Sequence, residues 1–69
     1  MKDVRIETEY IKLGQFLKWV GIADTGAESK ELITESKVKV NGQVELRRGK
    51  KLRKGDIIEL GGNKYRIVD

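Results

Sequence analysis

Between Ser36 and Gly55 the chain concentrates basic side chains. This segment contains a single acid, Glu45, and eight basic residues: Lys37, Lys39, Arg47, Arg48, Lys50, Lys51, Arg53 and Lys54. The remainder of the chain holds more acidic than basic residues, although the whole has a formal net charge of +4. A positive field concentrated in this way attracts polyanions. The chemistry that the segment predicts is binding to the phosphates of a nucleic acid.

The residue inventory argues against catalysis. The chain has no cysteine and no histidine, which removes thiolate nucleophiles, the usual zinc ligands and the side chain that most readily exchanges protons near neutral pH. No motif pairs a nucleophile with a base, cradles a phosphate with glycines or has metal-ligand spacing. We therefore expect a binding protein with no enzymatic activity, no metal and no cofactor.

Size and composition predict one small domain over residues 1–69. A chain of 69 residues with 38% hydrophobic and 38% charged residues can bury only a thin core. No apolar run approaches a membrane span, and the N-terminus lacks the continuous apolar segment of a secretion signal. We expect a soluble, cytoplasmic and monomeric protein.

Two elements are predicted at the start of the chain. Over residues 3–8 polar and apolar residues alternate, with Val4 and Ile6 on one side, which predicts a half-buried strand. From about Glu9 the apolar period becomes helical, and Gly21 is expected to end that helix. The apolar stripe of this helix consists of Leu13, Phe16, Leu17 and Val20.

A second helix is predicted to run to about Glu35. Thr25 and Glu28 have the spacing of a capping box, in which the Thr25 hydroxyl accepts a hydrogen bond from the Glu28 amide. Leu32 and Ile33 would form its buried side.

Asn41 and Gly42 indicate a β-hairpin because both residue types tolerate positive φ. A strict two-residue turn would place apolar residues opposite polar ones. We therefore expect a bulged turn that points four apolar side chains inward. The expected cross-strand pairs are Val40 with Val44 and Val38 with Leu46, while Lys37, Lys39 and Glu45 face outward.

The rest of the chain is predicted to contain a basic loop and two strands. Arg47–Lys54 is too charged to be buried and should be a loop over the sheet, anchored by Leu52. Apolar residues between turn signals predict strands at Ile57–Leu60 and about 64–68. The predicted order is one strand, two helices and four strands.

Four groups of residues between Lys12 and Leu60 match a known family without gaps. They are Lys12-Leu13 with Phe16-Leu17; Gly21-Ile22-Ala23 followed by Thr25, Glu28, Lys30 and Leu32-Ile33; Val38-Lys39-Val40-Asn41-Gly42; and Gly55-Asp56-Ile57-Ile58-Glu59. On these residues the chain resembles the small RNA-binding domain named after protein four of the small ribosomal subunit, the S-four domain or αL motif. It is most similar to the stand-alone members of the YaaA and YbcJ type.

The resemblance implies an α+β fold in which two short helices pack on a small, bent antiparallel sheet of about five strands. It implies a non-catalytic protein with RNA lying across the helices and the first hairpin. The positions expected to meet RNA are Lys12, Thr25, Lys30, Lys37, Lys39 and Asn41. Asn41 is expected to serve its turn first, and the alternative for the lysines is that they are solvated surface charges.

Two glycines depart from the family pattern. Gly14 replaces the usual acidic residue of the first helix, and Gly26 stands where many members have an arginine that contacts RNA. Gly26 is nevertheless a candidate, because backbone N–H groups at a helix start can bind a phosphate.

The basic loop adds further candidates for phosphate contact: Arg47, Arg48, Lys50, Lys51 and Arg53. Repulsion within such a run favours an anionic partner, and Gly49 allows the loop to follow a phosphate backbone. We expect contact from several of them, and a loop that is disordered in the free protein is compatible with this.

Trp19 lies on a helical stripe with Lys12 and Gln15 that borders the core stripe. Its indole can stack on an unpaired base beside Lys12. It can equally cover the edge of the core or the N-terminal strand, and we favour this packing role because small domains commonly bury tryptophan.

We therefore predict binding of structured RNA, with ribosomal RNA and ribosome assembly or maturation suggested by the resemblance alone. One alternative is a protein-interaction adaptor tethered to RNA, whose acidic side docks a partner through Glu28, Glu31, Glu35 and Glu59. Another is an accessory subunit of an RNA-modifying enzyme. DNA binding is also open, because attraction to phosphates does not distinguish the polymers.

Overall fold

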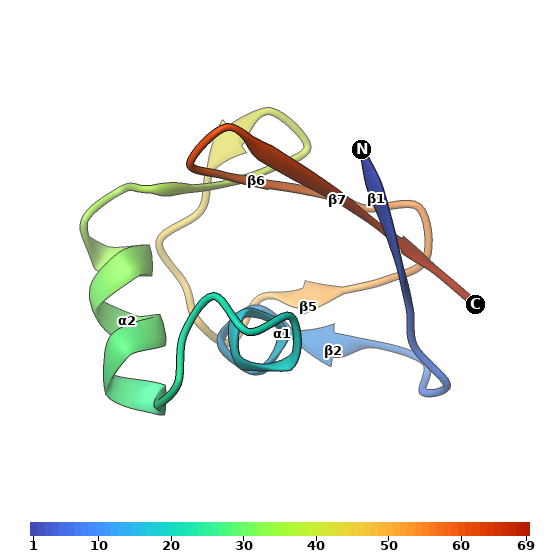
Figure 1. Ribbon diagram of the computed structural model, residues 1–69, viewed down its shortest axis with the longest axis horizontal. Helices are drawn as coiled ribbons and strands as arrows, with labels where there is room; N and C mark the ends of the chain where they lie inside the picture. The colour runs from blue at the N-terminus through green and yellow to red at the C-terminus, as the bar shows by residue number, and fades with distance from the viewer.

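The computed structural model describes all residues, 1–69, and consists of a β-sheet layer above a layer that contains both helices (Figure 1). A short ribbon of two strands lies beside the first helix, at the level of the helical layer. In chain order the elements are β1 (Lys2–Arg5), β2 (Ile11–Lys12), α1 (Leu13–Trp19), α2 (Gly26–Thr34), β3 (Val38–Val40), β4 (Gln43–Val44), β5 (Lys51–Leu52), β6 (Ile57–Leu60) and β7 (Asn63–Val68).

The main sheet has the strand order β1-β7-β6-β3-β4. The α+β class with two helices and a five-stranded sheet is thus confirmed. One feature differs from the expected antiparallel sheet: β1 pairs in parallel with β7, with Lys2 beside Tyr65 and Arg5 beside Val68. The sheet is mixed because its two terminal strands run in the same direction, with both helices inserted between them in the chain.

The expected register of the first hairpin is wrong by one residue. Val40 pairs with Gln43 and Lys39 with Val44, so the turn contains only two residues. Asn41 and Gly42 have φ values of 52° and 83°, which match the type I′ turn whose twist suits a tight hairpin. Turn geometry therefore overrides the apolar pattern. The consequence is that Val44 and Leu46 are 47% and 56% exposed instead of pointing inward.

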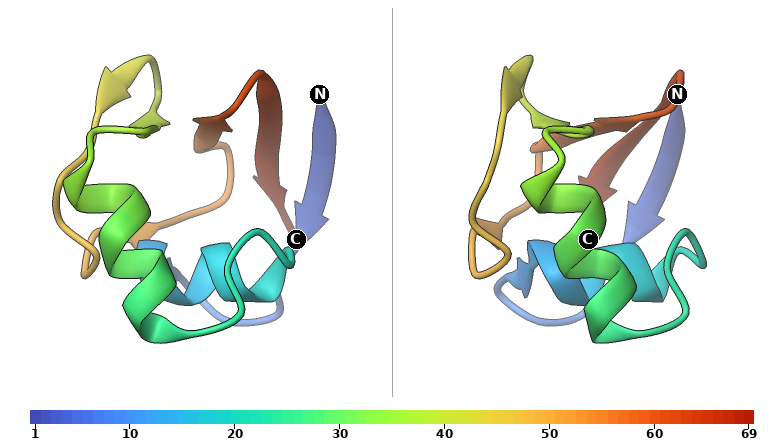
Figure 2. Two further views of the ribbon diagram at one scale, coloured as in Figure 1. Left: turned by 60° about the vertical axis from the view of Figure 1, so that its left-hand side comes forward. Right: turned by 90° about the vertical axis from the view of Figure 1, so that its left-hand side faces the viewer.

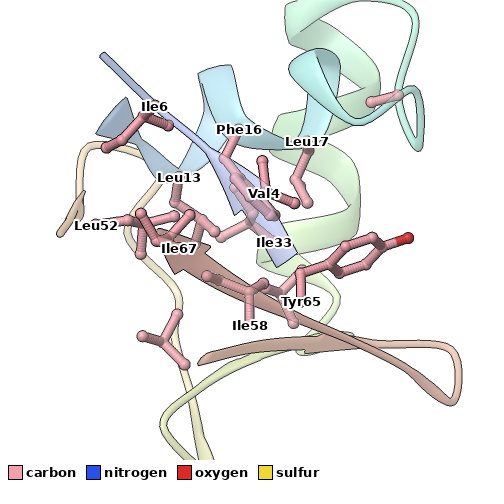
Figure 3. Packing of buried hydrophobic residues seen from close by; sticks show 13 residues of the cluster. Val4, Ile6, Leu13, Phe16, Leu17, Ile33, Leu52, Ile58, Tyr65 and Ile67 are labelled. Atoms are coloured by element: carbon pink, nitrogen blue, oxygen red, sulfur yellow. The ribbon is translucent and has the colours of Figure 1, made fainter. Parts of the chain in front are cut away.

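The core lies between the helices and the sheet (Figure 3). Phe16 and Leu17 project from α1 towards the strands, and the Phe16 ring meets the Tyr65 ring edge-on, with centroids 5.8 Å apart and planes at 78°. The completely buried side chains include Leu13, Phe16, Leu17, Ile33, Val38, Leu52, Ile58 and Ile67. Each such side chain stabilises the fold by roughly 1.5 to 3 kcal/mol.

Both helices have the predicted apolar faces, but α1 begins later than expected. The residues before it, Ile11–Lys12, are extended and pair with β5 instead of continuing the helix. Gly21 follows the helix with a φ of 81°, as its C-terminal position predicts. At α2 the Glu28 amide donates to Thr25 Oγ1 over 3.1 Å, which is the predicted cap. None of the helices has the length and apolar composition needed to cross a membrane.

Candidate nucleic-acid interface

A polar cleft of about 270 Å³ lies where the beginnings of α1 and α2 meet the segment that follows β4. Its lining contains no apolar and no acidic residue. It includes three cations, Lys12, Lys18 and Arg48, and none of them forms an ion pair within the chain. Positive side chains that converge without counter-charges form a site suited to an anion.

Glycines keep this cleft open. Gly26 is the first residue of α2, and a Cβ atom added there would meet nothing within 4 Å. The first amides of a helix have no intrahelical acceptor, so Gly26 places the positive end of the α2 dipole at the wall of the cleft, where an anion is favoured. Gly14, on the other wall, stands where the S-four resemblance places an acid. Its lack of a side chain leaves the cleft without a negative charge.

Backbone and side-chain hydrogen bonds join the walls of the cleft. The buried Ser29 Oγ of α2 donates to the Gly14 carbonyl of α1 over 3.0 Å. The amides of Leu13 and Gly14 donate to the carbonyls of Lys50 and Arg48 over 2.8 and 2.9 Å. Lys12 provides no side-chain cap for α1. The carbonyls of residues 47–54, called the basic segment from here on, cap the helix in its place. The cleft is therefore built before any ligand arrives.

The sequence predicted that the basic segment is a loop over the sheet. In the structure it is instead a connection fixed to the helical layer. Figure 2 shows it descending from β4 in the sheet to β5 beside α1. There β5 pairs with β2, and Leu52 is completely buried. The Tyr10 ring lies 4.8 Å from Lys51 Nζ and 5.5 Å from the guanidinium carbon of Arg53, distances at which cations are attracted to an aromatic face. Strand pairing and the buried Leu52 side chain thus hold this segment against the helical layer.

Ion pairs already engage several of the candidate cations. Arg47 binds the Glu45 carboxylate through Nε over 3.1 Å and through Nη2 over 3.3 Å. This side-chain hydrogen bonding from Arg47 lowers the pKa of Glu45 below its usual value. Arg53 Nη1 lies 3.8 Å from Glu9, and Lys54 Nζ lies 2.8 Å from Asp69. In the basic segment, Arg48, Lys50 and Lys51 have no acidic partner.

The lysines of the first hairpin lie outside the cleft. Lys37 and Lys39 are exposed, as expected, but neither lines it. Lys37 Nζ is 3.1 Å from Glu35, and Lys39 stands opposite Glu59 in the register of β3 with β6. Their positive charges are therefore partly balanced by neighbouring acids.

Hydrogen bonds from the Asn41 side chain link the turn of the first hairpin to the Gly55–Glu59 motif. Its Nδ2 donates to Asp56 Oδ1 over 3.1 Å, and its Oδ1 accepts from the Ile57 amide over 2.9 Å. The other Asp56 oxygen accepts from the Arg53 amide over 2.8 Å. Both ends of the Asn41 amide are thus occupied within the protein, which confirms its structural role in the turn. A contact between Asn41 and RNA stays a prediction.

The remaining residues expected to contact RNA lie at α2. A further candidate, on α1, was not predicted from the sequence. Thr25 caps α2, and Lys30 is exposed one turn after Gly26 without an ion-pair partner. Lys18, which the sequence analysis did not select, lines the cleft. Its spacing of four from Gly14 places both residues on one helix face, and this was the available signal.

The expectation that Trp19 packs against the core is wrong, because its side chain is 68% exposed. The interior beside α1 is already filled by the Phe16 and Tyr65 rings. Trp19 instead lines an open groove of about 880 Å³ between α1 and residues 6–11.

The expected acidic side is not one surface. Glu28, Glu31 and Glu35 share a shallow depression of about 240 Å³ on α2 with Ile22 and Leu32. Glu59 lies on β6 opposite Lys39, away from that depression. No group of three or more Asp or Glu side chains converges closely enough to hold a metal ion.

The chain is similar in sequence to two bacterial proteins. The chain is 42% identical over 67 residues to RlbA of Bacillus subtilis (strain 168), named as a probable ribosome maturation protein, covering 96% of this chain and 94% of that one. It is 34% identical over 59 residues to YbcJ of Escherichia coli (strain K12), a provisionally named RNA-binding protein, covering 86% and 84% of the two chains.

A solved structure and a family model give the same result. The solution structure of YbcJ from E. coli, described as revealing an αL motif involved in RNA binding, superposes with a TM-score of 0.73 at 30% identity. That match covers 100% of this chain and 89% of the other. The sequence model of the S4 domain matches residues 4–68. The chain therefore belongs to the S4 domain family.

Proposed function

We propose that this protein binds structured RNA without catalysing a reaction on it, and that the cleft between α1, α2 and the basic segment holds the RNA backbone. The observation that carries this proposal is the convergence of Lys12, Lys18 and Arg48, all without acidic partners, beside the open start of α2. Lysine, arginine and helix N-termini are typical phosphate ligands in nucleic-acid complexes.

The mode of recognition follows from the chemistry of the lining. Gln15 is the one side-chain amide in the cleft, and glycines form much of the rest. Such a surface contacts phosphates and the shape of the backbone, and it offers little that reads base edges. Shape and backbone contacts are the usual means by which folded RNA is recognised.

The relatives support a narrower RNA class. RlbA is named for ribosome maturation and YbcJ for RNA binding, and both align over most of this chain. We therefore propose ribosomal RNA as the target and assembly or maturation of a ribosomal subunit in the cytoplasm as the process.

Salt titrations of binding to a fluorescent RNA stem-loop and to a DNA duplex of equal length test the RNA proposal. We expect the RNA to bind more tightly, with an affinity that falls steeply as salt rises. The variant Lys12→Ala/Lys18→Ala should lower the salt slope by roughly 1 for each phosphate that the protein no longer neutralises.

The matched control is Lys2→Ala/Lys64→Ala, which removes the same charge from exposed lysines on β1 and β7. It should leave the slope nearly unchanged. Equal weakening by both variants would show that binding follows net charge and not the cleft, and failure to bind either polymer would refute the function. The ribosomal proposal is tested separately, by whether wild-type protein but not the cleft variant sediments with ribosomal subunits.

A further inference from the structure

An open groove continues the cleft along α1. It measures about 880 Å³ and lies between α1 and residues 6–11. Lys12, Gln15 and Lys18 line both the cleft and the groove. A strand whose phosphates occupy the cleft therefore passes directly beside the groove.

Trp19 is the one exposed aromatic side chain of the molecule. The chain has four aromatic residues, and Phe16 and Tyr65 pack against each other in the core. The ring of Tyr10 already makes cation–π contacts with Lys51 and Arg53. Trp19 has no such partner and is 68% exposed at the groove. An exposed indole beside cations is the arrangement with which proteins stack unpaired bases.

The charges of the groove indicate which part of a nucleotide enters it. Lys12 and Lys18 stand on the wall shared with the cleft, whereas Glu7 and Glu9 stand on the opposite side. Because the carboxylates repel phosphates, the backbone is held at the lysines. A base carries no net charge, so it can occupy the space between the lysines and the glutamates.

We propose that an unpaired nucleotide of the bound RNA places its base in this groove and stacks it on Trp19, while its phosphates stay at Lys12 and Lys18. Gln15 and Trp19 are four residues apart in α1, about 6 Å along the axis, which adjacent nucleotides of a single strand can span. The preferred ligand is accordingly a stem interrupted by an unpaired nucleotide and not a continuous duplex. This inference rests on the proposed function.

Two RNA duplexes without a hairpin loop, identical except for a single bulged nucleotide in one of them, test the inference. Binding of each is followed at one salt concentration by the fluorescence of Trp19, the only tryptophan, and by anisotropy of an RNA label. We expect the bulged duplex to bind about tenfold more tightly and to quench Trp19. The variant Trp19→Ala should lose this preference while keeping its affinity for the fully paired duplex, and Trp19→Phe should retain part of it.

The cleft variant Lys12→Ala/Lys18→Ala separates the two proposals, because it should weaken binding to both duplexes. Equal wild-type affinity for the two duplexes, or an undiminished preference in Trp19→Ala, overturns the base-stacking inference and leaves the proposed function standing. Failure of wild-type protein to bind either duplex overturns both proposals.

Discussion

The cleft and the first hairpin carry similar numbers of basic residues but differ in their surroundings. Lys12 and Lys18 belong to α1 and its N-cap, whereas Arg48 lies far along the chain, and the three meet without an acid between them. Lys37 and Lys39 are close in the sequence; Lys37 pairs with Glu35, and Lys39, which forms no ion pair, stands opposite Glu59 in the register of β3 with β6. A positive field depends on where counter-charges lie in space, so linear charge density alone misplaces its centre.

The largest expected effect comes from reversing charge in one region at a time. Lys12→Glu/Lys18→Glu and Lys37→Glu/Lys39→Glu change the net charge equally. The cleft pair should weaken RNA binding about a hundredfold, or roughly 2.7 kcal/mol, because it introduces carboxylates where we propose that phosphates bind. The hairpin pair should cost less than about tenfold in the same anisotropy titration. A stronger effect of the hairpin pair would indicate that RNA binds at β3 and not at the cleft.

The hairpin should instead prove important for stability. Asn41→Ala removes two side-chain hydrogen bonds and places a Cβ-bearing residue without local polar support at a φ of 52°. We expect the free energy of unfolding to fall by about 2 kcal/mol in urea titrations. Asn41→Gly keeps the turn accessible and should lose only about half as much. RNA affinity of the folded variants should be unchanged, and a matching drop in affinity would assign Asn41 a direct contact.

A smaller gain is expected from adding charge to the cleft. Gly26 has open space around it and no positive φ, so Gly26→Arg fits without strain. The added guanidinium should tighten RNA binding by up to about tenfold, or roughly 1.4 kcal/mol. Gly26→Ala is the control and should bind like the wild type. If Gly26→Arg weakened binding, the RNA backbone would have to approach the amides of α2 more closely than an arginine allows.

The smallest effect concerns Glu45, whose pKa is held below its usual value of about 4.5 by hydrogen bonding from Arg47. A carboxylate with a lowered folded-state pKa stabilises the fold above its unfolded-state pKa, and this contribution disappears as pH falls through the folded-state value. Glu45→Gln should therefore be less stable than wild type at pH 7, with the difference shrinking below about pH 4.5. Thermal unfolding between pH 3 and 7 measures this, and a constant difference across the range would contradict it.

Local patterns in the sequence predicted most of the elements but not all of their partners. The apolar stripe of α1, the Thr25 cap and the strands of β6 and β7 follow from periodicity and turn residues, and the structure contains them. The apolar pattern does not predict the hairpin register, because the backbone geometry that Asn41 and Gly42 require decides it.

Contacts between segments that are distant in the sequence are the main features that the sequence does not predict. The pairing of β2 with β5 involves two residues from each strand, which is too short for a periodic signal. The same pairing carries Arg48 to the helices, so the cleft could be predicted only in part. The resemblance indicates Lys12, and the anion-binding chemistry of a helix start indicates Gly26, whereas their meeting with Arg48 depends on this long-range contact.

The capping of α1 by backbone carbonyls has a consequence for the timing of folding. The amides of Leu13 and Gly14 find their acceptors at Lys50 and Arg48, which are synthesised much later. Short isolated helices are marginal in water, so α1 remains incomplete on a growing chain until the basic segment has emerged. The helix and the segment that face the same cleft thus complete their shared hydrogen bonds only after residue 50 has been synthesised.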